Sequence, residues 1–407
     1  MTTTAPAATR MAPVVWALGL TQIVGYGTLY YSFSTLAPQM ARSFGWTEEW
    51  VYGALSASLL LGGLVAPLAG SAADRFGAAR VMSVGSIGAA LALVATALAP
   101  ERLSFLVGLA GMEVASAFVL YSTAFAALAQ INPLGAQRSI TLLTLIAGFA
   151  STLFWPLTAL LNGALGWREV YLVFAALNLL VCLPVHGWLG RVSRRQRASG
   201  PDGRATEVPP QIDGARAGRA QLVMLLAFAL LGFVSSSILV HMVPMLAALG
   251  LGGSGVLVTT LFGPAQVLAR LVNMRFGRGL SQPALAVIAA AAMPLGLVLL
   301  ALSAPSAPGA ALFAMLFGLG SGLSSIVSGT LPLALFGTAG YGRRLGLISS
   351  ARLVVSSVAP FVFALATALA SPRLSVAMVA GVGIASTLCF AVLWASARAV
   401  APEGKGT

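Results

Sequence analysis

The feature that most constrains this chain is a succession of apolar segments of about 20 residues, separated by short polar stretches. A helix of about 20 residues crosses a hydrocarbon layer of roughly 30 Å. The apolar runs are continuous and lack the alternation typical of a membrane barrel, so they indicate helices. Hydrophobic residues make up 58% of the chain and charged residues 8%, too little charge to cover a soluble surface. We therefore expect an all-α polytopic membrane protein.

The apolar segments predict twelve membrane-spanning helices in two groups of six. The groups are separated by the polar stretch 191–220, whose Arg, Gly and Pro residues are typical of a flexible linker with little packed structure of its own. We expect an N-terminal half over 1–190, a cytoplasmic linker over 191–220 and a C-terminal half with a short tail over 221–407. The predicted helices are 14–37, 50–70, 81–99, 103–130, 139–163, 169–190, 221–249, 255–274, 282–303, 309–337, 345–369 and 374–398.

The two halves contain similar short sequences at matching places. ADRFGAAR at 73–80 follows the second predicted helix, and MRFGRG at 274–279 follows the eighth. AQRSITLL at 136–143 and GRRLGLIS at 342–349 begin the fifth and eleventh helices. Two similar halves are a recurring plan of secondary transporters, in which the substrate binds between them near the middle of the membrane.

The basic residues lie mostly on one side of the predicted helices. This asymmetry follows the positive-inside rule and places both termini in the cytoplasm. It accounts for the net charge of +13 without a nucleic-acid partner, and it favours the plasma (inner) membrane. The basic residues predicted on the opposite side are Arg42, Arg102, Arg168 and Arg373.

The stretch GSAADRFGAAR at 70–80 resembles the loop signature of the major facilitator superfamily. The resemblance implies the fold of that family, with twelve helices in two halves, and it implies that Asp74 acts in a latch on the cytoplasmic side. The alternative is that Arg75 and Arg80 only hold the loop inside. The residues that match the signature are Gly70, Asp74, Arg75, Gly77 and Arg80.

Other segments are similar to the branch of monocarboxylate porters and oxalate–formate exchangers. FGWTEEWV at 44–51 and LGWREVYLVFAALNLLVCLP at 165–184 resemble Gly-Trp segments of that branch. GLISSARLVVSSVAP at 346–360 resembles a stretch in which a basic residue faces the central cavity and binds carboxylate, which implies this role for Arg352. The signatures of proton-linked drug exporters are weak at 107–117 and 147–163.

Three charged residues lie well inside predicted helices: Glu113, Arg270 and Arg352. A charge at the middle of a membrane helix costs about 2.5–3.5 kcal/mol, so each needs a partner or water. Guanidinium groups match carboxylate geometry, and we predict that Arg352 and Arg270 bind an anionic substrate. Alternatively, Arg270 snorkels to the interface and Gln266 takes its place. Glu113 either carries a coupling proton or faces the substrate, or it pairs with a basic residue that holds helices together.

Two further residues are candidates. His241 either titrates in the coupling cycle or bonds a carbonyl freed by Pro244. Tyr26, in GYGTLYYS at 25–32, is the best candidate of its segment for a substrate-cavity residue. The glycine-dense stretch FGLGSGLSS at 317–325 acts either as a flexible gate or as a close-packing face.

These observations predict a secondary active transporter that works by alternating access and moves a small organic anion, such as a monocarboxylate, by proton coupling or exchange. The alternatives are a proton-coupled exporter of a hydrophobic or cationic compound and a membrane sensor that binds ligand without moving it. An enzyme is not expected, because two histidines and one intramembrane carboxylate give no catalytic pair or metal cluster. We expect a monomer without cofactor or metal, whose partners are the substrate, a proton or counter-anion, and the lipid bilayer.

Overall fold

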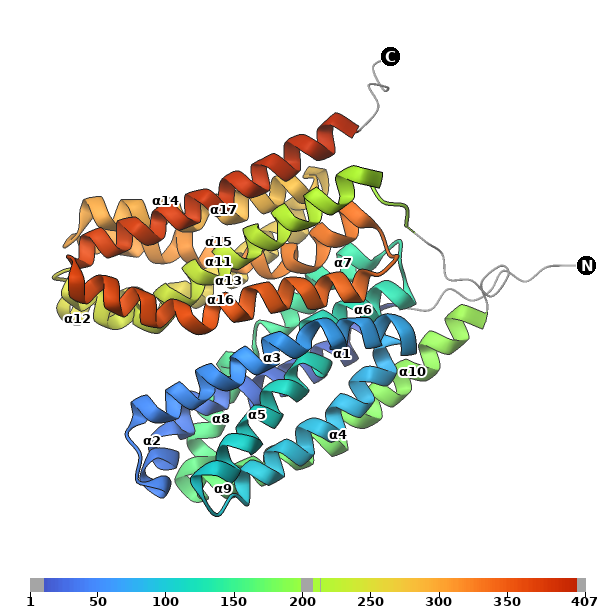
Figure 1. Cartoon of the computed structure of the whole chain (residues 1–407), viewed down its shortest axis with the longest axis horizontal. Helices are drawn as coiled ribbons and strands as arrows, with labels where there is room; N and C mark the ends of the chain where they lie inside the picture. The colour runs from blue at the N-terminus through green and yellow to red at the C-terminus, as the bar shows by residue number, and fades with distance from the viewer. Residues whose placement is uncertain (1–10, 199–207, 213, 401–407) are drawn as a thin grey trace, which may run out of the picture. The chain divides into compact units, whose positions relative to one another are not determined.

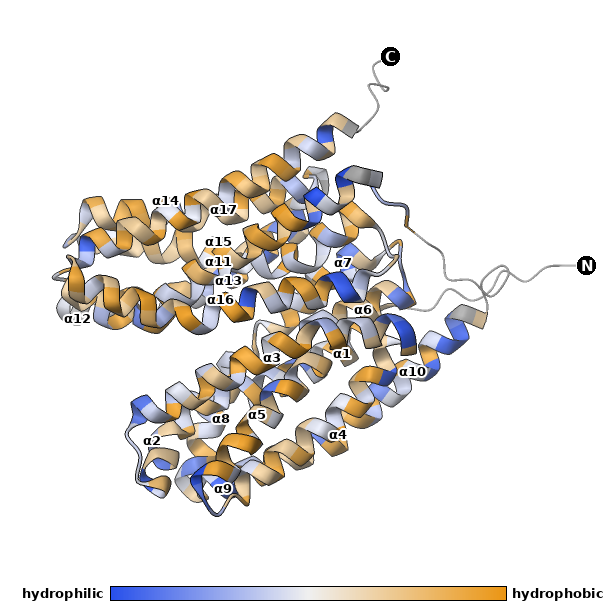
Figure 2. Cartoon of the chain, viewed as in Figure 1, coloured by the Kyte–Doolittle hydropathy of each residue, from blue (hydrophilic) through white to orange (hydrophobic). Residues whose placement is uncertain are grey.

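The structure, a computed structural model, describes residues 11–198, 208–212 and 214–400, and helices dominate these ranges. Eleven helical stretches in the described part of the chain are long and apolar enough to cross a membrane. Hydrophobic residues cover most of their length, and hydrophilic residues gather at several helix ends (Figure 2). The protein is therefore an all-α polytopic membrane protein, as the apolar segments predict.

The chain divides into two compact units, drawn in Figure 1. The N-terminal unit contains residues 1–208 and 338–346, so it includes the first turns of α16. Its helices are α1 (Met11–Tyr26), the π-helix η1 (Gly27–Tyr31), α2 (Ser32–Phe44), α3 (Glu48–Phe76), α4 (Ala78–Ala97), α5 (Arg102–Val119), α6 (Tyr121–Ile131), α7 (Ala136–Ala147), α8 (Ala150–Ala164), α9 (Trp167–Leu177), the π-helix η2 (Asn178–Cys182) and α10 (Leu183–Ala198).

The C-terminal unit contains residues 209–337 and 347–407. Within it, α14 packs against both α15 and α17 (Figure 1). Its helices are α11 (Gly214–Ala248), α12 (Gly252–Thr259), α13 (Phe262–Phe276), the short η4 (Gly277–Gly279), α14 (Gln282–Ser303), α15 (Ala307–Phe336), α16 (Tyr341–Leu369) beyond its first turns, and α17 (Pro372–Val400).

The helix predicted at 255–274 is present as two shorter helices, α12 and α13, and it is not among the eleven long stretches. Thr260 interrupts it. The Thr260 hydroxyl donates to the Leu257 carbonyl at 2.6 Å, and the N–H groups of Thr260 and Leu261 bond three residues back. A threonine hydroxyl that competes for a backbone carbonyl in this way weakens the regular helix.

The stretch 191–220 has more structure than its composition suggests. Helices extend to Ala198 and begin again at Gly214. Between them, the N–H groups of Gln211 and Ile212 donate to the Leu335 carbonyl at 3.0 Å, and Ile212 is 2% exposed. The expectation of little packed structure is therefore wrong for Gln211 and Ile212, because their backbone bonds the end of α15 and the Ile212 side chain is buried.

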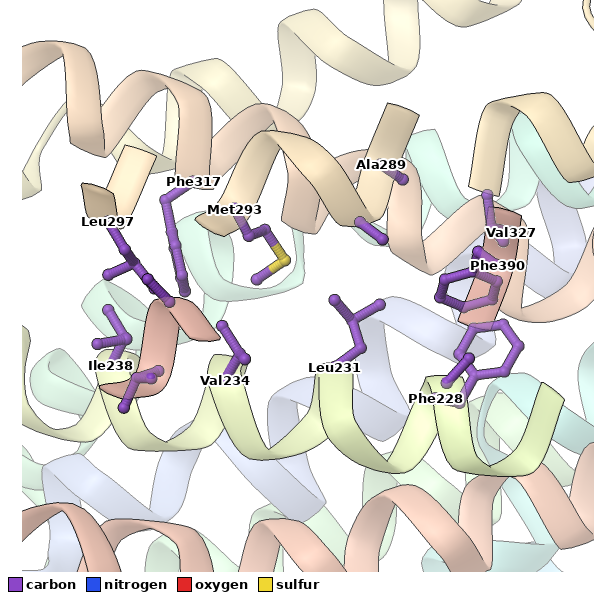
Figure 3. Close-up of a cluster of buried hydrophobic side chains, with 14 of the residues drawn as sticks. Phe228, Leu231, Val234, Ile238, Ala289, Met293, Leu297, Phe317, Val327 and Phe390 are labelled. Atoms are coloured by element: carbon purple, nitrogen blue, oxygen red, sulfur yellow. The ribbon is translucent and has the colours of Figure 1, made fainter. Parts of the chain in front are cut away.

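Each unit has its own core. In the C-terminal unit, Phe228 of α11 and Phe390 of α17 meet edge to face at 5.1 Å, and Met293 and Phe317 extend the same cluster (Figure 3). In the N-terminal unit, rings from α2, α5 and α9 pack together. These cores fix the helices that position the candidate site residues.

Candidate functional site

Arg270 and Gln266 lie one turn apart on α13, and both bind α15. The Arg270 Nε donates to the Ser325 hydroxyl at 3.2 Å and to the Gly322 carbonyl at 3.4 Å. The Gln266 side-chain amide donates to the Ser321 hydroxyl at 3.0 Å. Arg270 is 6% exposed, so it does not snorkel, and its Nη1 has no hydrogen-bond partner in the described chain. A fixed, buried guanidinium with an unused donor is suited to an anionic acceptor.

The glycines of α15 allow this close contact. A Cβ at Gly318 would lie 2.6 Å from the Phe262 carbonyl oxygen, and one at Gly322 would lie 2.5 Å from that of Gln266. Of the two roles predicted for the stretch 317–325, the structure therefore supports close packing. The small residues bring the α15 hydroxyls within reach of the α13 side chains.

Arg352 on α16 has a different environment. It is exposed, and its side chain lies over Gly232 of α11, where a Cβ would approach the Arg352 Cγ to 2.7 Å. Ser356, one turn later, donates to the Gly232 carbonyl at 3.1 Å. No hydrogen bond or ion pair of the Arg352 guanidinium is found within the described ranges. The guanidinium is therefore available to a ligand, but nothing fixes it as Arg270 is fixed.

Tyr26 belongs to an aromatic group in the N-terminal unit. Its ring centroid lies 4.7 Å from that of Tyr121, which begins α6, and 6.4 Å from that of Tyr31. Tyr121 stacks on Phe125 at 5.1 Å. The group lies where helix geometry is interrupted twice, at η1 and at the break between α5 and α6. Such interruptions are frequent at functional sites.

Glu113 is buried inside the N-terminal unit, at 5% exposure. Its backbone packs against α3 at Gly62, where a Cβ would lie 2.9 Å from the Glu113 carbonyl oxygen. Neither a basic partner nor a hydrogen bond to its carboxyl is found among the described residues. The predicted alternative, a structural ion pair, therefore has no partner in this part of the chain.

His241 on α11 is half-buried. Its ring lies 5.1 Å from that of Phe363, and its Nδ1 is 3.1 Å from the Ser237 carbonyl oxygen, one turn earlier. That carbonyl differs from the one that Pro244 frees, which belongs to Val240. The histidine thus bonds a backbone group, but for another reason than the proline.

The latch residues lie against the first turn of α16, within the N-terminal unit. The Asp74 carboxylate accepts the N–H groups of Gly342 and Arg343, both at 2.8 Å. This arrangement caps a helix N-terminus, where unpaired N–H groups and the helix dipole favour an anion. A Cβ at Gly70 would overlap the Gly342 carbonyl oxygen, which explains the glycine.

The other latch residues have simpler roles. Gly77 ends α3 with a φ of 90°, a conformation that favours glycine. Arg75 lies over the ring of its neighbour Phe76 at 5.1 Å, and Arg80 is exposed at the start of α4. Within the described ranges, the cap on α16 comes from Asp74, and neither arginine takes part in its two hydrogen bonds.

Gln130 of α6 is a structural residue that the sequence does not reveal. Its carbonyl oxygen accepts from the Ala78 N–H at 2.9 Å, and its amide donates to the Ala73 carbonyl at 2.9 Å. It thereby joins the end of α3 to the start of α4 around Gly77. In the sequence, Gln130 is only a lone glutamine at the end of an apolar helix. That pattern does not indicate a partner about 50 residues away.

Three of the four arginines predicted on the side opposite the cytoplasm cap helix ends. Arg168 donates to the carbonyls of Ala97 and Ala99 at 2.6 and 2.8 Å, and Arg373 donates to that of Ala304. Arg102 donates to the Phe44 carbonyl at 3.0 Å. Arg168 and Arg373 are the second residues of α9 and α17, so the two halves use the same device at matching places.

The structure thus places Arg270 and Gln266 against the same stretch of α15, and Asp74 and Gly70 against the first turn of α16. It places Glu113 and Tyr26 in the N-terminal unit, and Arg352 and His241 in the C-terminal unit. Among the described residues, no hydrogen bond or ring contact links Arg352 to Arg270.

Comparisons with known proteins agree with this architecture. The family model of the major facilitator superfamily matches residues 18–360. A solved structure of the human organic anion transporter MFSD10 (TETRAN) is 17% identical, with a TM-score of 0.68 over 95% of this chain and 100% of that chain.

Two further solved transporters have a similar fold. The proton:xylose symporter XylE, bound to 6-bromo-6-deoxy-D-glucose, is 13% identical, with a TM-score of 0.68 over 93% of this chain and 95% of that chain. FucP, in the outward conformation, is 12% identical, with a TM-score of 0.64 over 96% of this chain and 99% of that chain. A comparison with curated proteins gives no significant match. Because the family model covers most of its length, the chain belongs to the major facilitator superfamily of secondary transporters.

Proposed function

We propose that this transporter moves a small organic anion, such as a monocarboxylate, by alternating access. The observation that carries the proposal is the buried Arg270, whose Nε is fixed to α15 and whose Nη1 has no partner in the described chain. A buried charge of this kind is costly in a membrane protein unless a ligand uses it. A carboxylate matches the geometry and charge of the unused donor.

Arg352 supplies the second contact in this proposal. Its guanidinium is without a partner in the described ranges, so it can move to an incoming carboxylate. The sequence resemblance to the branch of monocarboxylate porters and oxalate–formate exchangers supports the same role. The fold of the human organic anion transporter is compatible with such a cargo, but the residues carry the proposal.

Glu113 is the better candidate for a coupling proton. It is a buried carboxyl without a basic partner in the described chain, whereas His241 is half-buried and bonded to a backbone carbonyl. Tyr26 and Gln266 are proposed as neutral contacts of the substrate. A proton bound at Glu113 neutralises the charge that the anion brings.

The Asp74 cap on α16 acts as the latch of this cycle. Two charge-assisted hydrogen bonds hold one conformation, and they break when the first turn of α16 moves away. We place this latch and both termini on the cytoplasmic side of the plasma membrane, following the distribution of basic residues.

A ligand screen by thermal shift tests the proposed cargo. Purified protein is heated with organic acids, amines and hydrophobic drugs, since a ligand at 100 times its Kd stabilises the fold by about 2.7 kcal/mol. We expect monocarboxylates to stabilise the protein. Arg270→Gln should raise their apparent Kd about 10- to 100-fold, and Arg275→Gln should leave it unchanged. Arg275 is a matched control, because it lies on the same helix over the Phe276 ring. Stabilisation by amines or drugs alone, unaffected by loss of either Arg270 or Arg352, would favour the exporter of hydrophobic or cationic compounds.

A further inference from the structure

A short segment of the central linker, residues 208–212, is bonded to the turn between α15 and α16. The Val208 N–H donates to the Thr338 hydroxyl at 3.1 Å, and the Thr338 N–H donates to the Val208 carbonyl at 3.3 Å. Further along the segment, the Gln211 N–H donates to the Leu335 carbonyl at 3.0 Å. The linker segment and the turn therefore run antiparallel and are bonded at two places. We call the linker segment the strap.

The strap is stiff and is anchored at its far end. Pro209 and Pro210 fix their own φ angles, and the residue before a proline, here Val208, is restricted to extended backbone. Ile212 is 2% exposed within the hydrophobic cluster of the C-terminal unit, and its N–H also donates to the Leu335 carbonyl at 3.0 Å. A stiff segment loses little conformational entropy when it bonds, so these few bonds suffice to hold the turn.

The turn that the strap holds leads directly into the latch. The Tyr341 N–H donates to the Thr338 carbonyl at 3.3 Å, and the Arg344 guanidinium donates to the Ala339 carbonyl. The first turn of α16 is therefore bonded back to the residues beside the strap. The same helical turn carries the two N–H groups that Asp74 accepts. The turn 338–346, Asp74 and the first residue of the strap all belong to the N-terminal unit.

The first turn of α16 lies close against the backbone of α3. A Cβ at Gly342 would lie 2.6 Å from both the Gly70 carbonyl oxygen and an Asp74 carboxylate oxygen. One at Gly346 would overlap the Ala66 carbonyl oxygen. Because this contact is made by backbone atoms, a displacement of the turn is not absorbed by side chains. It lengthens or breaks the two hydrogen bonds of the cap.

We propose that the strap stabilises the Asp74 cap on α16, so that the central linker controls the strength of the latch. While the strap is bonded, it holds the turn in place and the cap stays closed. When the strap is released, the first turn of α16 leaves α3 more readily, and the balance between the two conformations of the cycle shifts. The inference rests on the proposed latch role of Asp74 and adds the segment that controls it.

Hydrogen exchange of the full-length, lipid-reconstituted protein tests the strap at the amides of Gly342 and Arg343. Val208→Pro removes the N–H that donates to the turn and leaves the turn itself unaltered. Ile212→Ala removes the buried anchor at the other end of the strap. We expect both amides to exchange about 3- to 10-fold faster in each variant, the effect of losing about one hydrogen bond.

Two further variants make the result specific. Gln211→Ala changes an exposed side chain, keeps the backbone bond to Leu335 and leaves the exchange unchanged. Asp74→Ala removes the cap itself and gives the fastest exchange.

Fast exchange in Asp74→Ala with unchanged exchange in both Val208→Pro and Ile212→Ala would overturn the strap and leave the cap standing. Unchanged exchange in Asp74→Ala would contradict the cap and, with it, both the latch and the strap. The measurement needs no transported substrate, so its outcome does not depend on the proposed cargo.

Discussion

Replacing Gly322 with alanine places a methyl group where the backbone of α13 already lies. The added Cβ would lie 2.5 Å from the Gln266 carbonyl oxygen, 2.9 Å from its Cα and 3.1 Å from its carbonyl carbon. All three are backbone atoms, so no side chain can rotate away and the two helices must separate. Overpacking of this kind costs about 1–3 kcal/mol, which exceeds the gain of about 0.5–1 kcal/mol from replacing a helical glycine.

The free energy of unfolding is therefore expected to fall by about 1–2 kcal/mol. At about 2–4 °C per kcal/mol, this lowers the Tm by about 2–8 °C. Separation of α13 from α15 also stretches the hydrogen bonds of Arg270 and Gln266 to Ser325 and Ser321, so ligand binding weakens with stability. Thermal unfolding of the purified protein, with and without ligand, measures both effects.

Gly381→Ala is the matched control for this prediction. Gly381 lies inside α17 of the same unit, and a Cβ there meets no atom within 4 Å. Alanine at this position gains helix propensity without a clash, so its Tm stays equal or rises by about 1–4 °C. If Gly322→Ala unfolds at the same temperature as Gly381→Ala, the close-packing explanation of the glycine-dense stretch is wrong.

Three further changes have defined outcomes. Asp74→Ala removes the cap of α16 and costs about 1 kcal/mol, measured as a lower Tm, while Asp74→Asn keeps one acceptor oxygen and loses less. Gln130→Leu leaves the Ala78 N–H without its acceptor and destabilises the turn at Gly77 by about 1–2 kcal/mol, which faster hydrogen exchange of 77–79 would reveal. Arg168→Met lowers the Tm more than Arg42→Met, because Arg168 donates to the carbonyls of Ala97 and Ala99 at and just beyond the end of α4; equal effects would contradict its capping role.

The apolar segments alone predict the helices and their grouping, because each must bury its backbone polar groups within itself when it crosses lipid. The family resemblance of the loop signature singles out Asp74 as a latch residue, but it does not name the partners of Asp74, which are the N–H groups of Gly342 and Arg343. The sequence does not predict that Thr260 divides a helix, since its hydroxyl acts on a local carbonyl and leaves the apolar pattern intact.

The candidate site is less predictable than the fold. That Arg270 is buried depends on which face of α13 meets the glycines of α15, and an apolar run does not specify that face.

Exchange of a radiolabelled monocarboxylate by proteoliposomes tests the central claim most directly, because only a transporter with an anion site produces flux. Lactate, pyruvate and benzoate serve as probes, with wild type, Arg270→Gln, Arg352→Gln and the control Arg275→Gln reconstituted at equal density. We predict saturable exchange in wild type and Arg275→Gln, and loss of at least tenfold in kcat/KM in each of the other two variants. Exchange that is unaffected by removing both Arg270 and Arg352 would contradict the account.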